Sequence, residues 1–462
     1  MEQTTAKKNK YEIDMCNGTI MDKLISFSLP LMLSGILQLM FNAVDIIVVG
    51  RFSGSQALAA VGSTSALINV FTNLFIGISL GANVLTARFY AAGREKEVSE
   101  TVHTAITLAL VSGIVMALVG LAFSRGALAL MGTPDDVIGL SALYMRIYFL
   151  GMPFFMLYNY GAAILRAVGD TKRPLLFLMI AGVINACLNM VLVIVFKLGV
   201  AGVAIATVIS QMISCVLVLR CLCRSESSYR LRFSELGMKG YYFKQIFSVG
   251  VPAGIQSTVI NFSNVLLQSS VNSFGSTAMA GYTAANNLLG FLYVSVNSIT
   301  QACMSFTSQN YGVGKLKRMD RVLADCMILS VVVAVVLGCI CYGFGPEILQ
   351  IYTEDAEVIA CGMEILAYTT ITYFLCGWMD LFPGALRGMG YSAVPMVLSV
   401  IGTVGTRVVW IFGIFPYHRS LAILFISYPA SWIITIVLQV ICFYFVRRRV
   451  HRRSQALAGQ EA

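Results

Sequence analysis

The chain has 462 residues, of which 58% are hydrophobic and only 12% are charged, and its formal net charge is +10. An average soluble domain is roughly 25% charged, so this composition excludes an ordinary soluble protein. A positive net charge can indicate nucleic-acid binding, but here the basic residues occupy short segments between apolar runs, which is typical of a membrane protein.

Twelve apolar runs follow one another along the chain, each long enough for the roughly 20 residues that a helix needs to cross a bilayer. They lie near residues 24–50, 57–83, 99–123, 138–163, 174–196, 199–221, 246–272, 279–307, 321–344, 358–386, 395–415 and 420–446. Pro30, Pro153, Pro252 and Pro383 fall inside four of these runs and predict kinks there. We therefore predict an all-α membrane protein with twelve transmembrane helices.

The second half of the chain repeats the first. The sequence LRAVG at 165–169 returns as LRGMG at 386–390, an offset of 221, and each copy is followed five residues later by proline. The same offset pairs Tyr90 with Tyr311. Each half holds six runs, an even number, so both halves enter the membrane from the same side. This predicts two six-helix bundles related by a pseudo-twofold axis along the membrane normal.

The longest polar connection lies between the sixth and seventh runs, where it would link the two bundles. The predicted parts are an N-terminal tail at 1–22, a first lobe at 23–222, a connector at 223–245, a second lobe at 246–446 and a basic tail at 447–462. Because the connector shows no apolar period, we expect it to be solvated.

Basic residues gather in alternate loops. The intervening loops carry only Arg51, Arg125, Lys197 and Arg419, whereas the connector alone holds several arginines and lysines. By the positive-inside rule this asymmetry predicts a multi-pass protein of the cell membrane with both termini in the cytoplasm. We expect no cleaved leader, because the first apolar run is too long for the core of a signal peptide. A basic patch for anionic lipid or nucleic acid is the alternative interpretation of the connector and the C-terminal tail.

Motifs of enzymes and ATP-driven pumps are absent from the sequence. The stretch Gly312–Lys315 lacks the spacing of a phosphate-binding loop, and neither H-E-x-x-H nor G-x-S-x-G occurs. The twelve cysteines are scattered and follow no disulfide or zinc pattern. We therefore predict a protein that is not an enzyme and has no cofactor other than a coupling ion. Its expected partners are the lipid bilayer and a small organic molecule, with no nucleic acid and no obligate protein partner.

Only two of the 22 acidic residues, Asp45 and Asp380, lie well inside the predicted spans. A carboxylate in hydrocarbon costs about 2.5–3.5 kcal/mol on insertion scales, so each should face a cavity or a partner. Asp380 shares its half with Arg407, the one arginine deep inside a predicted span, and helical rise places the two at comparable depth. We predict a structural ion pair between them; the alternative makes Asp380 a second coupling site.

Asp45 has no basic residue at matching depth. Counting about 1.5 Å per residue from the outer ends of the spans places Asn189 and Thr207 at a similar depth, and Asn185 lies one turn from Asn189. Hard cations take oxygen ligands, and a desolvated carboxylate can exchange a proton. These four residues, Asp45, Asn185, Asn189 and Thr207, therefore form a predicted site for Na⁺ or H⁺. The alternative is a hydrogen-bond network that only packs helices.

Gln38 and Asn42 share a helix face with Asp45, and the second half repeats this face without the charge. The repeat places Asn264 opposite Asn42 and Leu267 opposite Asp45. Both faces would line a central amphiphilic cleft suited to bulky, partly apolar solutes. The predicted substrate cavity comprises Gln38, Asn42, Asn69, Asn73, Asn261, Asn264, Gln268, Asn286, Tyr293 and Asn297.

Several stretches, taken in order, carry a resemblance to a known family. They are Pro30, residues 42–50 (NAVDIIVVG), the paired 165–169 and 386–390, Asn185, and residues 199–211 (GVAGVAIATVISQ). This order resembles the multidrug and toxic compound extrusion (MATE) family of cation-coupled efflux transporters, over nearly the whole chain except its tails. The resemblance implies antiport, in which Na⁺ or H⁺ entering down its gradient drives the export of an organic, often cationic, solute by alternating access.

The resemblance also implies roles for individual residues. It matches the family's span-one aspartate to Asp45, and polar residues of spans five and six to Asn185 and Thr207. The family's second span-five acid lies four residues after that asparagine, where this chain has Asn189, which leaves Asp45 as the only titratable member of the site.

Some family members carry a span-seven glutamate and a span-ten aspartate instead. Here span seven offers Ile260 and Asn261, and Asp380 lies about one turn from the expected position.

The alternative function is a flippase of the wider superfamily that moves lipid-linked oligosaccharide or peptidoglycan precursor. Such proteins need a cationic cavity for pyrophosphate, whereas this sequence places only Arg407 deep in a span. A receptor or channel is disfavoured by the duplicated plan of six and six spans.

Overall fold

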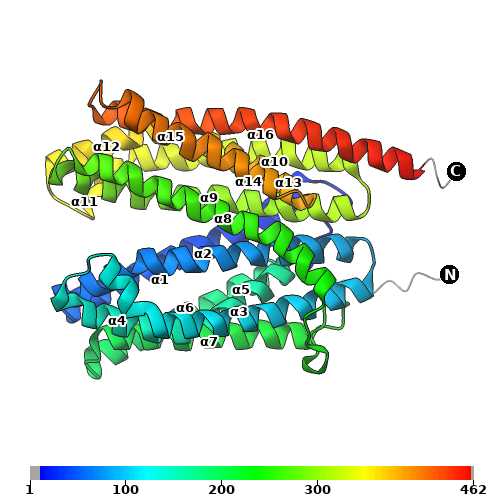
Figure 1. Cartoon of the computed structure of the whole chain (residues 1–462), viewed down its shortest axis with the longest axis horizontal. Coiled ribbons are helices and arrows are strands. Elements are labelled where there is room, and N and C mark those ends of the chain that lie inside the picture. The colour runs from blue at the N-terminus through cyan, green and yellow to red at the C-terminus, as the bar shows by residue number, and fades with distance from the viewer. Residues whose placement is uncertain (1–10, 459–462) are drawn as a thin grey trace. The chain divides into compact units, whose positions relative to one another are not determined.

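The computed structural model describes residues 11–458, and over these residues it is helical, with no strand (Figure 1). The chain separates into two compact units. Unit 1 comprises 1–14 and 33–254, and unit 2 comprises 15–32 and 255–462. Residues 1–10 and 459–462 lie outside the described part, so the predicted tails at 1–22 and 447–462 are described only in part.

The helices of unit 1 run from the first span to the start of the seventh. They are α1 (Met21–Phe52, whose first residues group with unit 2), α2 (Ser55–Ala91), α3 (Glu95–Leu130), α4 (Asp135–Leu150), α5 (Met152–Ala167), α6 (Lys172–Met190), the π-helical turn η1 (Val191–Val195), α7 (Gly199–Cys223), the short 3₁₀ turn η2 (Phe233–Glu235) and the first part of α8 (Gly240–Asn272).

Unit 2 holds the remaining helices. They are the rest of α8, α9 (Ser276–Gly312), α10 (Leu316–Gly343), α11 (Gly345–Gln350), α12 (Ala356–Thr369), α13 (Tyr373–Gly388), α14 (Ala393–Ser399), η3 (Val400–Gly405), α15 (Thr406–Val409), η4 (Trp410–Ile414) and α16 (Leu421–Ala458). The turns η3 and η4 are π-helical and enclose α15 on both sides.

Eight of the described helices are long and apolar enough to cross a membrane, and two bent helix pairs bring the number to ten. The other two predicted runs correspond to α8 and α9, which have 33 and 37 residues. Both carry several Asn, Gln and Ser residues, which lower their hydropathy. The predicted all-α membrane protein is confirmed, whereas the exact lobe boundaries stay a prediction.

The two bent pairs lie at equivalent places of the repeat. Helices α4 and α5 meet at Gly151 with a bend of 47°, and α12 and α13 meet near Thr372 with a bend of 51°. Pro153, at the start of α5, fits the kink predicted there, because proline removes a backbone donor. Pro383 lies inside α13, well past the second bend, so that bend does not form at the proline.

Small residues let α2 and the first part of α8 approach closely within unit 1. A Cβ added at Gly77 would stand 2.3 Å from the Cα of Gly254, and one added at Gly250 would stand 2.4 Å from the Cα of Ile78. Such contacts leave no room for any side chain, so glycine is required where these two backbones touch.

The connector between the two sets of spans is exposed or partly exposed over most of its length, as expected of a solvated segment, but a short part of it is packed. Tyr229 is fully buried and Leu231 is 2% exposed, and Tyr229 donates a 2.7 Å hydrogen bond to Glu12. The alternation of buried residues 229 and 231 with exposed Arg230 and Arg232 is a strand-like period of two, too short to stand out in the sequence.

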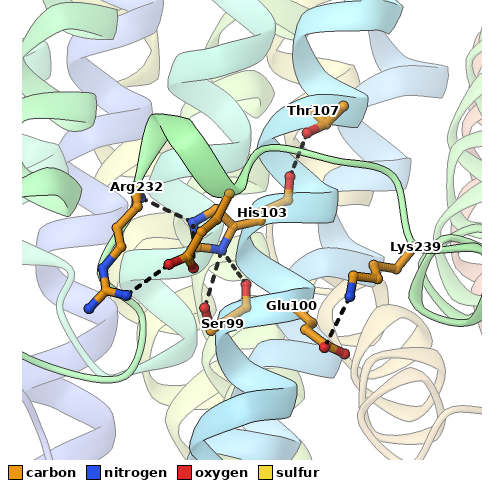
Figure 2. A network of polar contacts seen from close by, with 7 residues as sticks. Ser99, Glu100, His103, Thr107, Arg232 and Lys239 are labelled. Carbon is orange, nitrogen blue, oxygen red and sulfur yellow. Dashed lines mark hydrogen bonds and ion pairs between the residues drawn. The ribbon is translucent and has the colours of Figure 1, made fainter.

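A buried histidine of α3 anchors the connector (Figure 2). The Nε2 of His103 accepts a 3.0 Å hydrogen bond from the backbone N–H of Arg232, so its Nδ1 carries the proton and donates to the carbonyl of Ser99 at 2.6 Å. The Arg232 guanidinium donates to Glu235 at 2.8 Å and holds the pKa of that carboxyl below its usual range.

Candidate functional site

Asp45 of α1 lies against α6 inside unit 1. Its carboxylate accepts a hydrogen bond from Nδ2 of Asn189, and the same amide nitrogen donates to Oδ1 of Asn185 at 3.2 Å. Both asparagines are buried, whereas Asp45 is partly exposed. The structure therefore brings three of the four residues of the predicted cation site into direct contact.

Thr207 of α7 completes the group. Its hydroxyl donates to the carbonyl of Val203 at 3.0 Å and lies near the Asp45 carboxylate. Residues from α6 and α7 thus converge on Asp45 of α1. That they bind a cation stays a prediction.

One acceptor in this group lacks a partner. Oδ1 of Asn189 is buried and receives no hydrogen bond from any of the described residues. A buried acceptor without a donor carries a desolvation cost, which a bound cation or a proton on the adjacent carboxyl would offset. Together with the oxygens of Asp45 and Asn185, it offers the all-oxygen ligand set that Na⁺ prefers.

Close packing holds α1 against α6 at this level. A Cβ added at Gly182 would stand 1.8 Å from the ring of Phe41, so glycine is the residue that lets the ring fill this space. Gly182 lies about one turn before Asn185, and Phe41 lies one turn before Asp45. The π-helical turn η1 begins two residues after Asn189, and such turns often lie beside functional sites.

The equivalent place in unit 2 holds an arginine. The Arg407 guanidinium donates to Oδ1 of Asn264 at 2.7 Å and to the hydroxyl of Ser263 at 3.3 Å, and it stacks on the ring of Tyr428 at 4.7 Å. The repeat pairs Asn264 with Asn42 and Tyr428 with Thr207. Where the first half carries a carboxylate, the second half therefore carries its own cation.

The predicted ion pair between Asp380 and Arg407 is wrong. Arg407 is 3% exposed, its Nη1 donates to Asn264 and Ser263, and among the described residues no ion pair joins it to Asp380. The cation that acts on Asp380 is Arg387, two turns later on the same helix.

Arg387 is a buried arginine that the sequence analysis missed. It lies in the last turn of α13, is 9% exposed and donates to Oε1 of Gln256 at 2.6 Å. It belongs to the repeated LRGMG stretch, which was available as a signal, but its place at the end of a span made it resemble an ordinary loop cation.

The residues of the predicted substrate cavity differ in exposure. Gln38, Asn42, Asn69, Asn261, Asn286 and Tyr293 are exposed, whereas Asn73, Asn264, Gln268 and Asn297 are partly buried. Asn264 is held by Arg407, and Asn297 accepts a 3.1 Å hydrogen bond from Gln301. The assignment of these residues to a substrate cavity stays a prediction.

Comparison with known proteins places the chain among transporters. The MatE family model matches residues 30–191 and again residues 252–412, once in each half of the repeat. The probable multidrug resistance protein YoeA of Bacillus subtilis is 32% identical over 434 residues, which cover 92% of this chain and 93% of the relative. A second Bacillus subtilis relative, the probable multidrug resistance protein YpnP, is 27% identical and covers 84% of this chain and 87% of its own length.

Solved structures share the fold. An outward-facing conformation of a multidrug resistance MATE family transporter superposes with a TM-score of 0.87 at 19% identity, covering 97% of this chain and 100% of the other. The likeness supports the prediction of twelve helices in two bundles.

Proposed function

Because this chain belongs to the MATE family of multidrug efflux transporters, we propose that it is a secondary active antiporter that exports organic solutes in exchange for Na⁺ or H⁺. The expected solutes are amphiphilic and often cationic, and transport proceeds by alternating access. A lipid-linked oligosaccharide or peptidoglycan-precursor flippase is not favoured, because the relatives are multidrug resistance proteins.

One observation carries the proposal. Asn189 donates to the Asp45 carboxylate while its own carbonyl oxygen is buried without a partner among the described residues. A carboxylate beside an unused acceptor favours a small cation over a purely structural hydrogen-bond network, since the network would leave that acceptor unsatisfied. Asn185 and Thr207 supply further oxygens.

The coupling ion would act as a cosubstrate. When it binds, it neutralises Asp45 and gives the Asn189 oxygen a partner. When it leaves, the carboxylate is again charged and faces the Asn189 amide alone. A cationic solute and the ion then compete for the same negative charge, either directly or through the position of α1.

We further propose that both termini are cytoplasmic, that the protein lies in the cell membrane and that it works without an obligate protein partner. The basic residues that support this orientation include Lys315, Lys317 and Arg318 at the start of α10.

Purified protein in sealed lipid vesicles tests the function. An imposed inward Na⁺ or pH gradient should drive export of fluorescent organic cations, and dissipating the gradient should stop it. Transport that proceeds equally well without either gradient would show that the protein is not a cation-coupled antiporter.

A further inference from the structure

A cavity of about 650 Å³ opens in unit 2 between the N-terminal end of α1 and the first turns of α10. Its charged lining consists of Lys317, Arg318, Arg321, Asp22 and Asp325. Ile20 and Met21 add an apolar wall. Because α1 and α10 are both candidate membrane spans, the cavity lies where two such spans begin.

One of the three basic side chains, Arg318, already donates hydrogen bonds to backbone carbonyls of the chain. The Arg318 guanidinium donates to the carbonyls of Gly18 at 2.9 Å and Asn17 at 3.0 Å, and Lys315 donates to the carbonyl of Cys16 at 2.9 Å. Arg318 therefore fixes the segment that forms one side of the cavity.

The other two cations have no such partner. Lys317 and Arg321 are exposed, lie one turn apart on the same face of α10 and form no ion pair with any described residue. Like charges at this spacing repel one another, so the pair is favourable only where an anion joins it. Asp22 accepts a 3.0 Å hydrogen bond from Thr19 and does not reach either cation.

The start of α10 adds to the positive potential. Its first turn contains no acidic residue, so its unpaired backbone N–H groups are not compensated there. In the repeat, α10 corresponds to α3, whose first turn contains Glu95 and Glu97. The two helix starts are thus opposite in charge.

At the equivalent position of unit 1, both partners of an ion pair come from the chain itself. Arg318 and Arg321 correspond to Glu97 and Glu100 of α3. Glu100 pairs with Lys239 of the connector at 3.2 Å (Figure 2). In unit 2 the helix carries the cation instead, and no described acid pairs with Arg321 or Lys317. Over the described residues, the two cations of unit 2 are thus available to an anion from outside the chain.

We propose that this cavity binds the phosphate group of an anionic phospholipid, with Lys317 and Arg321 as its ligands. A phosphate offers several strong acceptor oxygens to a pair of cations and a helix N-terminus. A lipid is favoured over soluble phosphate because the cavity lies at the ends of two candidate spans and has an apolar wall beside its cations. This proposal is independent of the transport mechanism.

Native mass spectrometry of the full-length protein in detergent tests the site, with phosphatidylglycerol, phosphatidylcholine and inorganic phosphate as separate probes. The native chain should retain phosphatidylglycerol in preference to phosphatidylcholine. The double variant Lys317→Gln/Arg321→Gln should bind phosphatidylglycerol roughly 30-fold more weakly, since each basic residue near a lipid surface contributes about a fivefold factor.

The matched control is Arg94→Gln/Lys96→Gln, which removes two exposed cations from the equivalent loop of unit 1. It should leave phosphatidylglycerol binding unchanged. Equal losses in both double variants, or equal retention of both lipids by the native chain, would overturn the proposal. Displacement of the lipid by millimolar inorganic phosphate would assign the site to a soluble anion instead.

Two further measurements keep the test decisive if the glutamine variant does not fold. The swap Lys317→Arg/Arg321→Lys keeps both charges and should retain the lipid. Lipid binding by the native chain should also weaken as salt is raised, and binding that is independent of salt would contradict a charge-based site.

Discussion

Arg407 donates a 2.7 Å hydrogen bond to Oδ1 of Asn264, the residue that the repeat pairs with Asn42 one turn before Asp45. The second half of this transporter thus holds a fixed cation at the place where the first half offers a carboxylate. The positive charge of a buried guanidinium repels a second cation, so we expect no exchangeable cation to bind at this position of the second half. We therefore propose that ion coupling uses the first half alone.

A double-mutant cycle tests the partner of Arg407. We expect Arg407→Gln and Asn264→Ala to show a coupling energy of about 0.5–3 kcal/mol, because groups in contact lose one shared interaction. Arg407→Gln and Asp380→Asn should add within about 0.3–0.5 kcal/mol, as independent sites do. The measurement is the free energy of unfolding in mixed micelles. Strong coupling to Asp380 instead would restore the ion pair that the structure excludes.

Asn189→Leu should reduce gradient-driven transport by roughly tenfold or more, because a hydrogen bond to a charged group contributes about 1.5–3 kcal/mol. The substitution removes both the donor to Asp45 and the unused acceptor. Initial export rates in vesicles give the comparison. Asn272→Leu, at an exposed position at the C-terminal end of α8, is the control and should transport normally. Equal rates for both variants would show that Asn189 only packs.

Gly182→Val should displace Phe41 and move α1 away from α6, since even a Cβ at this position would stand 1.8 Å from the ring. We expect transport to fall as far as it does in Asn189→Leu, while the protein still inserts into the membrane. Gly62→Val is the matched control, because a Cβ added there meets nothing within 4 Å. If both valine variants transported alike, the close approach of α1 and α6 would not matter for the site.

His103→Ala should loosen the connector without touching the cation site. The variant leaves the Arg232 N–H without its buried acceptor, a loss worth about 1–3 kcal/mol. Limited proteolysis should then cleave the 224–239 segment faster than in the native protein. The variant Thr107→Ala, whose hydroxyl only caps a carbonyl of the same helix, provides the control. Unchanged cleavage in His103→Ala would mean that the connector is held by other contacts.

The sequence allowed the first-half site to be predicted because two simple rules agree there. Helical spacing puts Asn185 and Asn189 on one face, and depth counted from the span ends places Asp45 and Thr207 beside them. Helix α6 is α-helical up to the site, since η1 begins only after Asn189.

The same rules failed for Arg407, because depth in the membrane gives only the height of a residue along the helix and not the direction in which its side chain points. The direction around the helix axis was set by the π-helical turns η3 and η4 on either side of α15, which change the number of residues per turn. Nothing in the local sequence identifies such turns, so the face that Arg407 presents could not be derived. Arg387 was missed because it lies at the end of a span, where a loop cation is expected, and because its partner Gln256 lies 131 positions away.

The most direct test of the central claim is gradient-driven export by Asp45→Asn, compared with Asp380→Asn, in the same vesicles and under the same imposed gradient. Both variants remove one carboxylate from a membrane span. We expect Asp45→Asn to insert normally but to lose coupled export, whereas Asp380→Asn should retain it. Full export by Asp45→Asn, with loss in Asp380→Asn, would contradict the account and move the coupling site to the second half.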